Sequence, residues 1–425
     1  MYGFETKALH EGWSGDGFSH SVNTPLYLTN AYTFDSTEHA RRLFALEEGG
    51  NIYTRLSNPT TDVLETRFNA LEGGVGAIAT ATGHSAIFML MLSLAHSGDE
   101  IISSSCIYGG AVNMFRHTLS NSGIKANFVH PTDLEGFEAA INERTRAVFV
   151  ETVGNPTCDL CDIPALADIC HRHGLPLIVD STFTTPYLIR PIELGADIVV
   201  HSATKHIAGH GDVMGGIIVD SGKFDWVASG RYPQFTQPNP SYHGATFTDM
   251  FGNAALVAYL RTCAMRDYGV TISPFNSFML LRGLETLALR MDRSCANAKA
   301  AAEFLENHPF VESVLSPYVK SSRYYELGQK LLPNGNGGVI CFEIKGGREA
   351  GAKFIDSLKL IQNVANLGDT RSLVSHPAST THSQLTDEQL KASGISAGTI
   401  RLSLGLENIE DILADLSSAL DAASK

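Results

Sequence analysis

Residues 196–205 read ADIVVHSATK, and this stretch decides how the rest of the chain is interpreted. It consists of an apolar run that is followed by two hydroxyl residues and Lys205. A second apolar run, LIVD at 177–180, ends on Asp180. Both runs have the composition of buried strands, and ligands of open α/β sheets bind just beyond the carboxyl ends of the strands. The sequence therefore predicts a ligand site that contains Asp180 and Lys205.

Similar β-rich runs recur along the chain, with helical patterns between most of them. Between residues 163 and 173, for example, apolar residues recur at helical spacing. This alternation predicts an α/β fold in which a mostly parallel, seven-stranded sheet is covered by helices on both faces. The predicted strands are 77–80, 100–103, 126–129, 147–150, 177–179, 198–200 and 216–219.

The pattern also divides the chain into three parts. Residues 1–60 are irregular and polar and form a predicted N-terminal arm, and residues 61–269 hold the regular alternation. Residues 270–425 are rich in helical patterns, with sparser strands at 339–344 and 399–404. A final helix is predicted after Asn408, which is a favourable N-cap residue. We therefore expect a smaller C-terminal α/β domain.

The composition disfavours several classes of function. A net charge of −14 over 425 residues argues against nucleic acid or an anionic membrane as a partner. The longest apolar stretch, 86–95, is too short for a bilayer span, and residues 1–7 lack a secretory pattern. Seven scattered cysteines, Cys158 and Cys161 among them, are expected to be free thiols rather than metal ligands. We therefore expect a cytoplasmic enzyme with no metal.

An amine, a buried acid and hydroxyl groups are the partners that pyridoxal 5′-phosphate requires. Lys205 supplies an imine-forming amine, and Asp180 would keep the pyridine nitrogen protonated. A phosphate cradle is predicted at Gly83, where a glycine turn before an apolar helix lets backbone N–H groups approach an anion. Ser202 and Thr204 add hydroxyl donors. No dinucleotide or nucleoside-triphosphate motif occurs at this turn. Residues 61–269 are therefore predicted to form a pyridoxal-phosphate-binding domain.

Three further residues complete the predicted site. Tyr108 precedes two glycines and can stack on a flat cofactor while its phenol transfers protons. Asn155 can hold the ring hydroxyl, although Asn-Pro is also a common turn. Arg401 departs from the apolar character of its strand, and its guanidinium can bind a substrate carboxylate through two hydrogen bonds. Each residue alone has an ordinary structural explanation, but the combination favours a cofactor site.

Several short motifs are distributed along nearly the whole chain. They are YTR at 53–55, NPT at 58–60, YGG at 108–110, DSTF at 180–183, SATK at 202–205, QP at 237–238, PSYHG at 240–244, GD at 368–369 and HPASTTH at 376–382. In these motifs the chain resembles the cysteine and methionine metabolism branch of the fold-type-I pyridoxal phosphate enzymes. The segment 237–244 makes it similar to the O-acetylhomoserine sulfhydrylase subgroup, also called aminocarboxypropyltransferases.

This resemblance implies a role for each candidate residue. It identifies Lys205 as the Schiff-base lysine, Asp180 as the partner of the pyridinium nitrogen and Tyr108 as the stacking residue. Tyr53 and Arg55 would reach the cofactor phosphate of a neighbouring subunit, and family members are usually tetramers built from two dimers. The other implied cofactor contacts are Gly83, His84, Asn155, Thr182, Ser202 and Thr204, and the implied substrate contacts are Asn366 and Arg401.

The chain departs from the family pattern at three positions. His84 stands where relatives commonly carry Met or Gln, and Ser181 stands where Asn is usual. Neither change is expected to impair cofactor binding, because backbone groups and Asp180 do the main work. Ser375 stands where an aliphatic residue is more familiar, and it is expected to affect the preference for substrate or nucleophile.

The resemblance implies γ-replacement on O-acetyl-L-homoserine through a pyridoxal phosphate Schiff base. Acetate leaves, and sulfide or a thiol adds to give L-homocysteine or methionine. One alternative is methionine γ-lyase, in which a cysteine commonly occupies the position of Gly110; cystathionine γ-synthase or γ-lyase activity is another. A third alternative is a protein that retains the fold without catalytic activity. The presence of Lys205, Asp180 and Arg401 argues against it. The sequence does not decide between an acetyl and a succinyl leaving group, or between sulfide and methanethiol as nucleophile.

Overall fold

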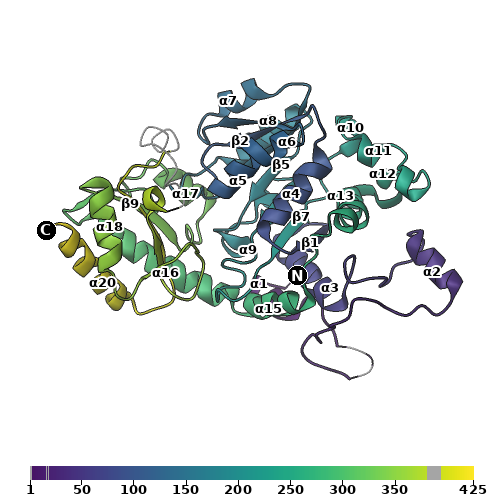
Figure 1. The fold of residues 1–425 in the computed structure, drawn as a ribbon, viewed down its shortest axis with the longest axis horizontal. Coiled ribbons are helices and arrows are strands. Elements are labelled where there is room, and N and C mark those ends of the chain that lie inside the picture. Colours follow the sequence, from purple (N-terminus) through teal and green to yellow (C-terminus); the bar gives the residue numbers. More distant parts are fainter. Residues whose placement is uncertain (1, 16, 18, 381–393) are drawn as a thin grey trace.

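Two β-sheets and the helices around them make up the computed structural model, which describes residues 2–15, 17, 19–380 and 394–425. Figure 1 shows the larger sheet at the centre and the smaller one toward the C-terminal end. The long helix α16 (Leu287–Glu306) leads from one to the other. On the opposite side a projecting segment carries α2 (Thr37–Phe44).

The larger sheet has seven strands in the order β1-β7-β6-β5-β4-β2-β3. The pairs that run from β3 through β2, β4 and β5 to β6 are parallel, whereas β7 is antiparallel to both β6 and β1. Every run predicted from the sequence for this sheet is a strand, which confirms the predicted fold class. The strands are β1 (Gly76–Thr80), β2 (Glu100–Ser104), β3 (Lys125–Val129), β4 (Thr145–Glu151), β5 (Leu177–Asp180), β6 (Ile198–His201) and β7 (Gly216–Asp220).

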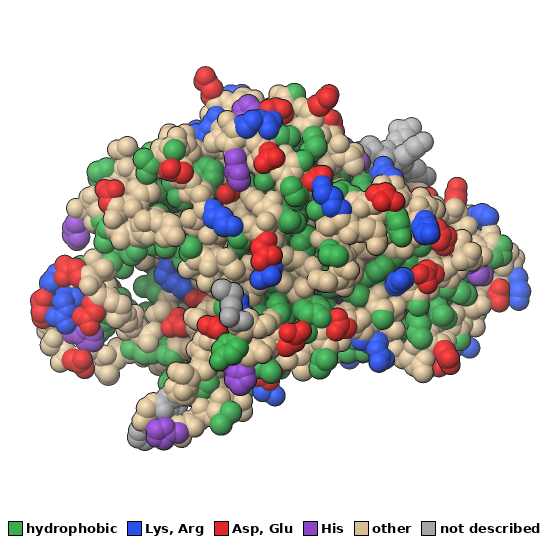
Figure 2. Space-filling model, turned by 180° about the vertical axis from the view of Figure 1, so that it is seen from behind, with side chains coloured by type: hydrophobic (Ala, Val, Ile, Leu, Met, Phe, Trp, Pro, Cys, Tyr) green, Lys and Arg blue, Asp and Glu red, His purple; other side chains and the backbone are tan. Residues whose placement is uncertain are grey.

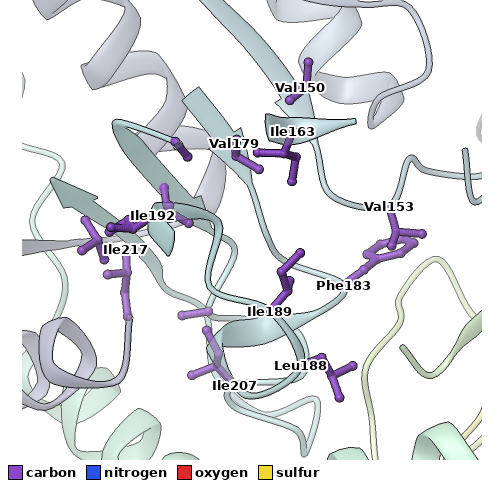
Figure 3. Close-up of a cluster of buried hydrophobic side chains, with 14 of the residues drawn as sticks. Val150, Val153, Ile163, Val179, Phe183, Leu188, Ile189, Ile192, Ile207 and Ile217 are labelled. Carbon is purple, nitrogen blue, oxygen red and sulfur yellow. The ribbon is translucent and has the colours of Figure 1, made fainter. Parts of the chain in front are cut away.

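Alternate residues of these strands are buried on opposite faces of the sheet. In β5, Leu177 and Val179 join one apolar cluster, whereas Ile178 joins a second one. Figure 3 shows part of the first cluster, where Ile163 lies beside Val179. A sheet that is covered on both faces has no polar face, which explains the near-continuous apolar runs. The first face is covered by α3 (Pro59–Glu72), α8 (Ile163–Arg172) and α15 (Pro274–Glu285), and the second by α4 (Gly83–Leu94) and α13 (Ala255–Tyr259).

The smaller sheet has five strands in the order β10-β11-β12-β9-β8. Its outer face packs against α16, α18 (Gly347–Ser357) and α20 (Ile409–Ala423). In β12, Ile400 and Leu402 belong to this helix-covered cluster, so Arg401 between them lies on the opposite face. The strands are β8 (Val311–Val314), β9 (Val339–Ile344), β10 (Gln362–Asn363), β11 (Leu373–Ser375) and β12 (Thr399–Ser403).

The last helix begins where the sequence predicts. The Asn408 side chain accepts a hydrogen bond from the backbone N–H of Glu410 and caps α20. In the described residues, no helix combines the length and the apolar character needed to cross a membrane. The remaining α-helices are α5 (Gly109–Asn113), α6 (Leu119–Asn121), α7 (Leu134–Ala140), α9 (Thr185–Leu188), α10 (Trp226–Ser229), α11 (Pro233–Thr236), α12 (Phe247–Phe251), α14 (Arg266–Tyr268) and α17 (Tyr325–Leu331).

The N-terminal segment is more regular than the sequence predicts. Both α1 (Phe4–His10) and α2 lie within residues 1–60, where irregular chain is expected. Helices this short are marginal by themselves, and α1 forms where it packs against α3. The segment around α2 instead stands away from the body, and Figure 2 shows the molecule hollowed between the two. Large apolar side chains are exposed on this segment, namely Val22, Tyr27, Leu28, Phe34, Phe44 and Tyr53.

Candidate active site

A cavity of about 440 Å³ lies at the carboxyl ends of β4, β5 and β6, beside the first turn of α4. This volume is within the range that small-molecule sites occupy. All the predicted site residues line it except Tyr53 and Arg55. Its polar lining is Thr82, Gly83, His84, Tyr108, Glu151, Asn155, Asp180, Thr182, Ser202, Thr204, Lys205, Asn366 and Arg401.

Lys205 lies at the centre of this cavity, on the turn after β6. Its Nζ donates a hydrogen bond to Oδ1 of Asn366, 2.6 Å away and 161 positions along the chain. Burial, and secondarily the charge of Arg401, lower the pKa of the Lys205 amine to about 8. About one tenth of such an amine is neutral at pH 7, whereas an ordinary lysine is almost fully charged. The amine is therefore prepared to react as a nucleophile or base.

The glycine turn at Gly83, where the sequence predicts a phosphate cradle, precedes a helix as expected. Helix α4 starts at Gly83, and Thr82 caps it through a reciprocal pair of hydrogen bonds with Ser85. A Cβ atom on Gly83 would stand 2.6 Å from the Cβ of Ser202, so only glycine allows this close approach. Backbone N–H groups of a first helical turn are free to bind an anion. The Thr204 hydroxyl is already engaged, since it accepts from the Gly215 N–H and donates to the Gly215 carbonyl.

Asp180 ends β5 with a nearly buried carboxylate, 9% exposed. The backbone N–H of Thr182 donates to its Oδ1 at 2.9 Å, and the Thr182 hydroxyl accepts from the backbone N–H of Ser202 at 2.8 Å. Burial raises the pKa of Asp180, while its hydrogen bonds with Thr182 and the nearby His201 oppose that change. Thr182 thus ties the acid to the strand that leads into Ser202 and Lys205.

Tyr108 and His84 form an aromatic pair at the rim of the cavity. Their rings meet edge to face, with centroids 5.8 Å apart. A Cβ atom on Gly110 would lie 2.5 Å from Cε1 of Tyr108, so the missing side chain is what leaves room for this tyrosine ring. Burial lowers the pKa of His84, which favours its neutral form. The tyrosine is about half exposed and faces the cavity as a platform.

Arg401 reaches the cavity from the smaller sheet. One guanidinium nitrogen donates to Oδ1 of Asn155 at 2.9 Å, and another donates to the backbone carbonyl of Asn366 at 3.0 Å. Its Nε is buried and has no hydrogen-bond partner among the described residues. Burial lowers the pKa of this guanidinium. A buried cation with an unused donor is suited to bind a carboxylate.

Tyr53 and Arg55 lie outside this cavity. Both side chains are exposed, and the Arg55 guanidinium stands over the Tyr53 ring at 5.7 Å. Arg55 also donates to the backbone carbonyl of Arg266 at 2.7 Å. That these two side chains serve a neighbouring subunit stays a prediction.

Glu151 lines the cavity and was not predicted as a site residue from the sequence. It is the last residue of β4 and the direct neighbour of Asp180 across the β4–β5 pair. The signal that marks Asp180, an acid at the carboxyl end of an apolar run, also marks Glu151, which follows the run at 147–150. The position of this acid at the end of a predicted strand is the signal in the sequence that could have identified Glu151.

The departures from the family pattern lie at different distances from the site. The Ser181 hydroxyl is fully buried and hydrogen-bonds the Thr184 hydroxyl at 2.8 Å, away from the cavity lining. Ser375 is buried on β11 as the partner of Arg401 across the β11–β12 pair. An effect of Ser375 on substrate preference stays a prediction. Thr381 and His382 of the predicted 376–382 motif lie outside the described residues.

The cysteines are all buried free thiols. Cys106, His130 and Asp159 bring possible metal-ligating atoms within 4.8 Å of one another. Asp159, however, already accepts hydrogen bonds from Thr157, Arg323 and Tyr324. Since an arginine occupies the carboxylate, we assign no metal to this cluster.

The cavity residues fit pyridoxal 5′-phosphate. Gly83 lies at the N-terminus of α4, where phosphate groups bind well. A Cβ atom at this position would fill the space beside Ser202. Asp180 and the weakly basic Lys205 amine line the same cavity, so a ring nitrogen and an aldehyde can each meet a partner. The unpartnered Nε of Arg401 offers a donor for a substrate carboxylate.

Comparison with known proteins agrees with this geometry. The family model described as Cys/Met metabolism PLP-dependent enzyme matches residues 5–421. O-acetyl-L-homoserine sulfhydrylase of Leptospira meyeri is 49% identical, over 98% of this chain and 96% of that protein. Homocysteine synthase of Schizosaccharomyces pombe is 48% identical, over 99% of this chain and 98% of that protein.

A solved structure is similar as well. It is the crystal structure of a putative O-acetylhomoserine (thiol)-lyase from Campylobacter jejuni, with N′-pyridoxyl-lysine-5′-monophosphate at position 205 of its own chain. Its TM-score is 0.96 at 39% identity, and the match covers 99% of this chain and 100% of that one. The family match alone spans far more than half of the sequence. The chain therefore belongs to the Cys/Met metabolism PLP-dependent enzyme family.

Proposed function

We propose that this enzyme replaces the acetate of O-acetyl-L-homoserine with sulfide or a thiol. With sulfide the products are L-homocysteine and acetate, and with methanethiol they are L-methionine and acetate. The sequence relatives named above, sulfhydrylases and homocysteine synthases, support this choice of reaction. The free, buried cysteines suit a reducing compartment, and we propose the cytoplasm.

One observation carries the proposal: Asn366 contacts both Lys205 and Arg401. Its side-chain oxygen accepts from the lysine amine at 2.6 Å, and its backbone carbonyl accepts from the guanidinium at 3.0 Å. An amino acid whose carboxylate is held by Arg401 would therefore present its α-carbon close to Lys205. The geometry provides for both the recognition of an α-amino acid and the removal of its α-proton.

The chain's own residues then have distinct tasks. When bound, pyridoxal phosphate supplies an electron sink for the substrate carbanion. Lys205 takes the proton from the α-carbon and next a proton from the β-carbon, so that acetate can leave from the γ-carbon, to which sulfur then adds. Tyr108, at the cavity rim, assists these proton transfers with its phenol.

The remaining assignments concern cofactor binding. Asp180 would hold the ring nitrogen, and the Asn155 amide, whose oxygen is bound by Arg401, would donate from its nitrogen to the ring hydroxyl. The phosphate contacts are Gly83, His84 and Ser202, and Thr182 and Thr204 keep the surrounding turns in place.

Gly110 supports replacement over lysis. A cysteine at this position would place its Cβ 2.5 Å from Cε1 and 2.8 Å from Cζ of Tyr108. Since the ring would have to move, the Tyr108 position seen here depends on a glycine at 110. Held in this position, Tyr108 would stack on the cofactor and shield the reacting carbon from water until a sulfur nucleophile arrives.

We expect sulfide-dependent homocysteine formation from O-acetyl-L-homoserine to exceed 2-oxobutyrate release from methionine by at least about tenfold, or about 1.4 kcal/mol. Steady-state rates with O-acetyl-, O-succinyl- and O-phosphohomoserine, with and without sulfide, identify the leaving group. The reaction without sulfide is the control for lysis. Equal rates of oxobutyrate formation from methionine would show that the enzyme is a γ-lyase.

We infer further that the enzyme is a tetramer in which each N-terminal segment completes a neighbouring site. The exposed apolar side chains around α2 and the hollow beneath them support this inference, since a second copy can bury them. Mixing inactive Arg55→Ala protein with inactive Lys205→Ala protein, under subunit exchange, is expected to restore part of the activity. Formation of hybrids without any recovery would contradict a shared site.

A further inference from the structure

Glu151 is a buried acid whose place in the cavity is not explained by the reaction. It is 8% exposed and stands at the carboxyl end of β4, beside Asp180 at the end of β5. None of the ion pairs among the described residues includes it. A carboxylate is costly to bury without partners, so its hydrogen bonds indicate what it does there.

Both carboxylate oxygens of Glu151 accept backbone N–H groups of predicted cofactor contacts. Oε1 accepts from Tyr108 at 2.7 Å, and Oε2 accepts from Asn155 at 3.1 Å. Tyr108 precedes α5 and has no side-chain cap of its own, and Asn155 lies in the turn that follows β4. One side chain thus joins two loops that are 43 and 4 residues away from it in sequence.

We propose that Glu151 is a positioning residue that fixes the Tyr108 ring and the Asn155 amide on the bound cofactor. The proposal rests on the cofactor contacts assigned under the proposed function. If the carboxylate holds both loops, the backbone of Tyr108 is fixed and its ring would meet the bound cofactor in one position. The Asn155 amide then also keeps its angle toward the ring hydroxyl and toward Arg401.

The neighbouring Asp180 also affects the protonation of Glu151. Burial and the neighbouring Asp180 both raise the pKa of Glu151, whereas the two backbone donors lower it. Because a raised pKa favours the protonated form, the role of Glu151 rests on its hydrogen bonds to the two backbone N–H groups and not on its charge.

The test is Glu151→Gln, which keeps the shape but removes one acceptor. The amide can accept from only one of the two N–H groups, and its own NH₂ faces the other donor. We expect pyridoxal 5′-phosphate to bind the apo-protein at least about tenfold more weakly. We also expect its induced circular dichroism in the visible region, which reports the orientation of the ring, to fall by at least half. The cofactor should still be found on Lys205 after borohydride reduction.

Glu65→Gln is the matched control. Glu65 is also buried, accepts the backbone N–H of Ala79 at 2.8 Å through one oxygen, pairs with Arg261 through the other and lies outside the cavity lining. We expect this variant to lower thermal stability while leaving cofactor affinity and visible dichroism unchanged. If Glu151→Gln does not fold, Glu151→Asp, which is too short to reach both loops, should show the same two changes.

Wild-type cofactor affinity and dichroism in a folded Glu151→Gln or Glu151→Asp protein would overturn the proposal. Equal changes in Glu65→Gln would overturn it too, because they would come from the loss of any buried carboxylate. Both readouts are made without substrate. They therefore remain informative even if wild-type protein fails to convert O-acetyl-L-homoserine, a result that would overturn the proposed function alone.

Discussion

Replacing Lys205 with alanine is expected to lower the turnover of O-acetyl-L-homoserine with sulfide by at least about 10⁴-fold, or about 5.4 kcal/mol in activation free energy. Both proton transfers proposed for the reaction need this amine, and alanine cannot form an imine with the cofactor. Among the described residues the side chain makes a single hydrogen bond, to Asn366, so the fold should persist. Steady-state kinetics, together with far-ultraviolet circular dichroism, measure the two effects separately.

Lys7→Ala is the control for this substitution. Lys7 is also half-buried and, within the part of the chain that the structure describes, makes one hydrogen bond, to the backbone carbonyl of Ala70 at 3.1 Å, but it lies outside the cavity lining. Its loss should leave turnover unchanged. After borohydride reduction, mass spectrometry of the wild-type protein should find the cofactor on Lys205. A modified lysine elsewhere would refute the assignment.

Replacing Arg401 with alanine is expected to lower kcat/KM for the same reaction by about 10³-fold, because the charge and the unpartnered Nε donor that would bind the substrate carboxylate are both lost. Arg401→Lys keeps the positive charge but loses the planar guanidinium, so its kcat/KM should lie between those of the wild type and Arg401→Ala. Arg67→Ala is the control, since Arg67 is also buried but binds the Glu11 carbonyl outside the cavity lining. A decrease of the same size for Arg67 would show that burial, rather than recognition, accounts for the loss.

The Arg401 variant also has a pH signature. The neutral Lys205 amine attacks the cofactor aldehyde, so uptake by wild-type apo-protein should accelerate with rising pH and level off above about pH 8, where the amine is mostly neutral. The charge of Arg401 is one of the two causes that lower this pKa. In Arg401→Ala the midpoint should therefore move upward, toward the ordinary lysine value of 10.5. An unchanged midpoint would mean that burial alone depresses the pKa.

The local pattern of apolar residues in the sequence was sufficient to predict where the strands of the larger sheet lie. The strands lie at the predicted runs because a parallel sheet covered on both faces selects continuous apolar residues, as in β5 and β6. Asp180 and Lys205 could be predicted for the same reason, since polar groups at the carboxyl ends of such strands meet at one edge. Gly83 was recognisable as a turn before a helix, and its contact with Ser202 explains why no larger residue stands there.

Contacts between distant segments were decided by the tertiary structure alone. The bond from Lys205 to Asn366 spans 161 positions, and that from Arg401 to Asn155 spans 246. The family resemblance named these residues, but no local pattern shows that they meet. Helix α1 was missed for a similar reason, because it is stabilised by α3 rather than by its own short sequence.

Glu151 shows most clearly that a local sequence pattern does not determine which groups a side chain contacts. Its sequence signal, an acid at a strand end, is the same as that of Asp180, yet the two carboxylates have different partners. A sequence states which side chains can accept hydrogen bonds, since that depends on residue type alone. Which donors they meet depends on how the loops after β2 and β4 are brought together by packing of the sheet. The chemistry of each group was therefore determined by the sequence, and its assembly into one site by the fold.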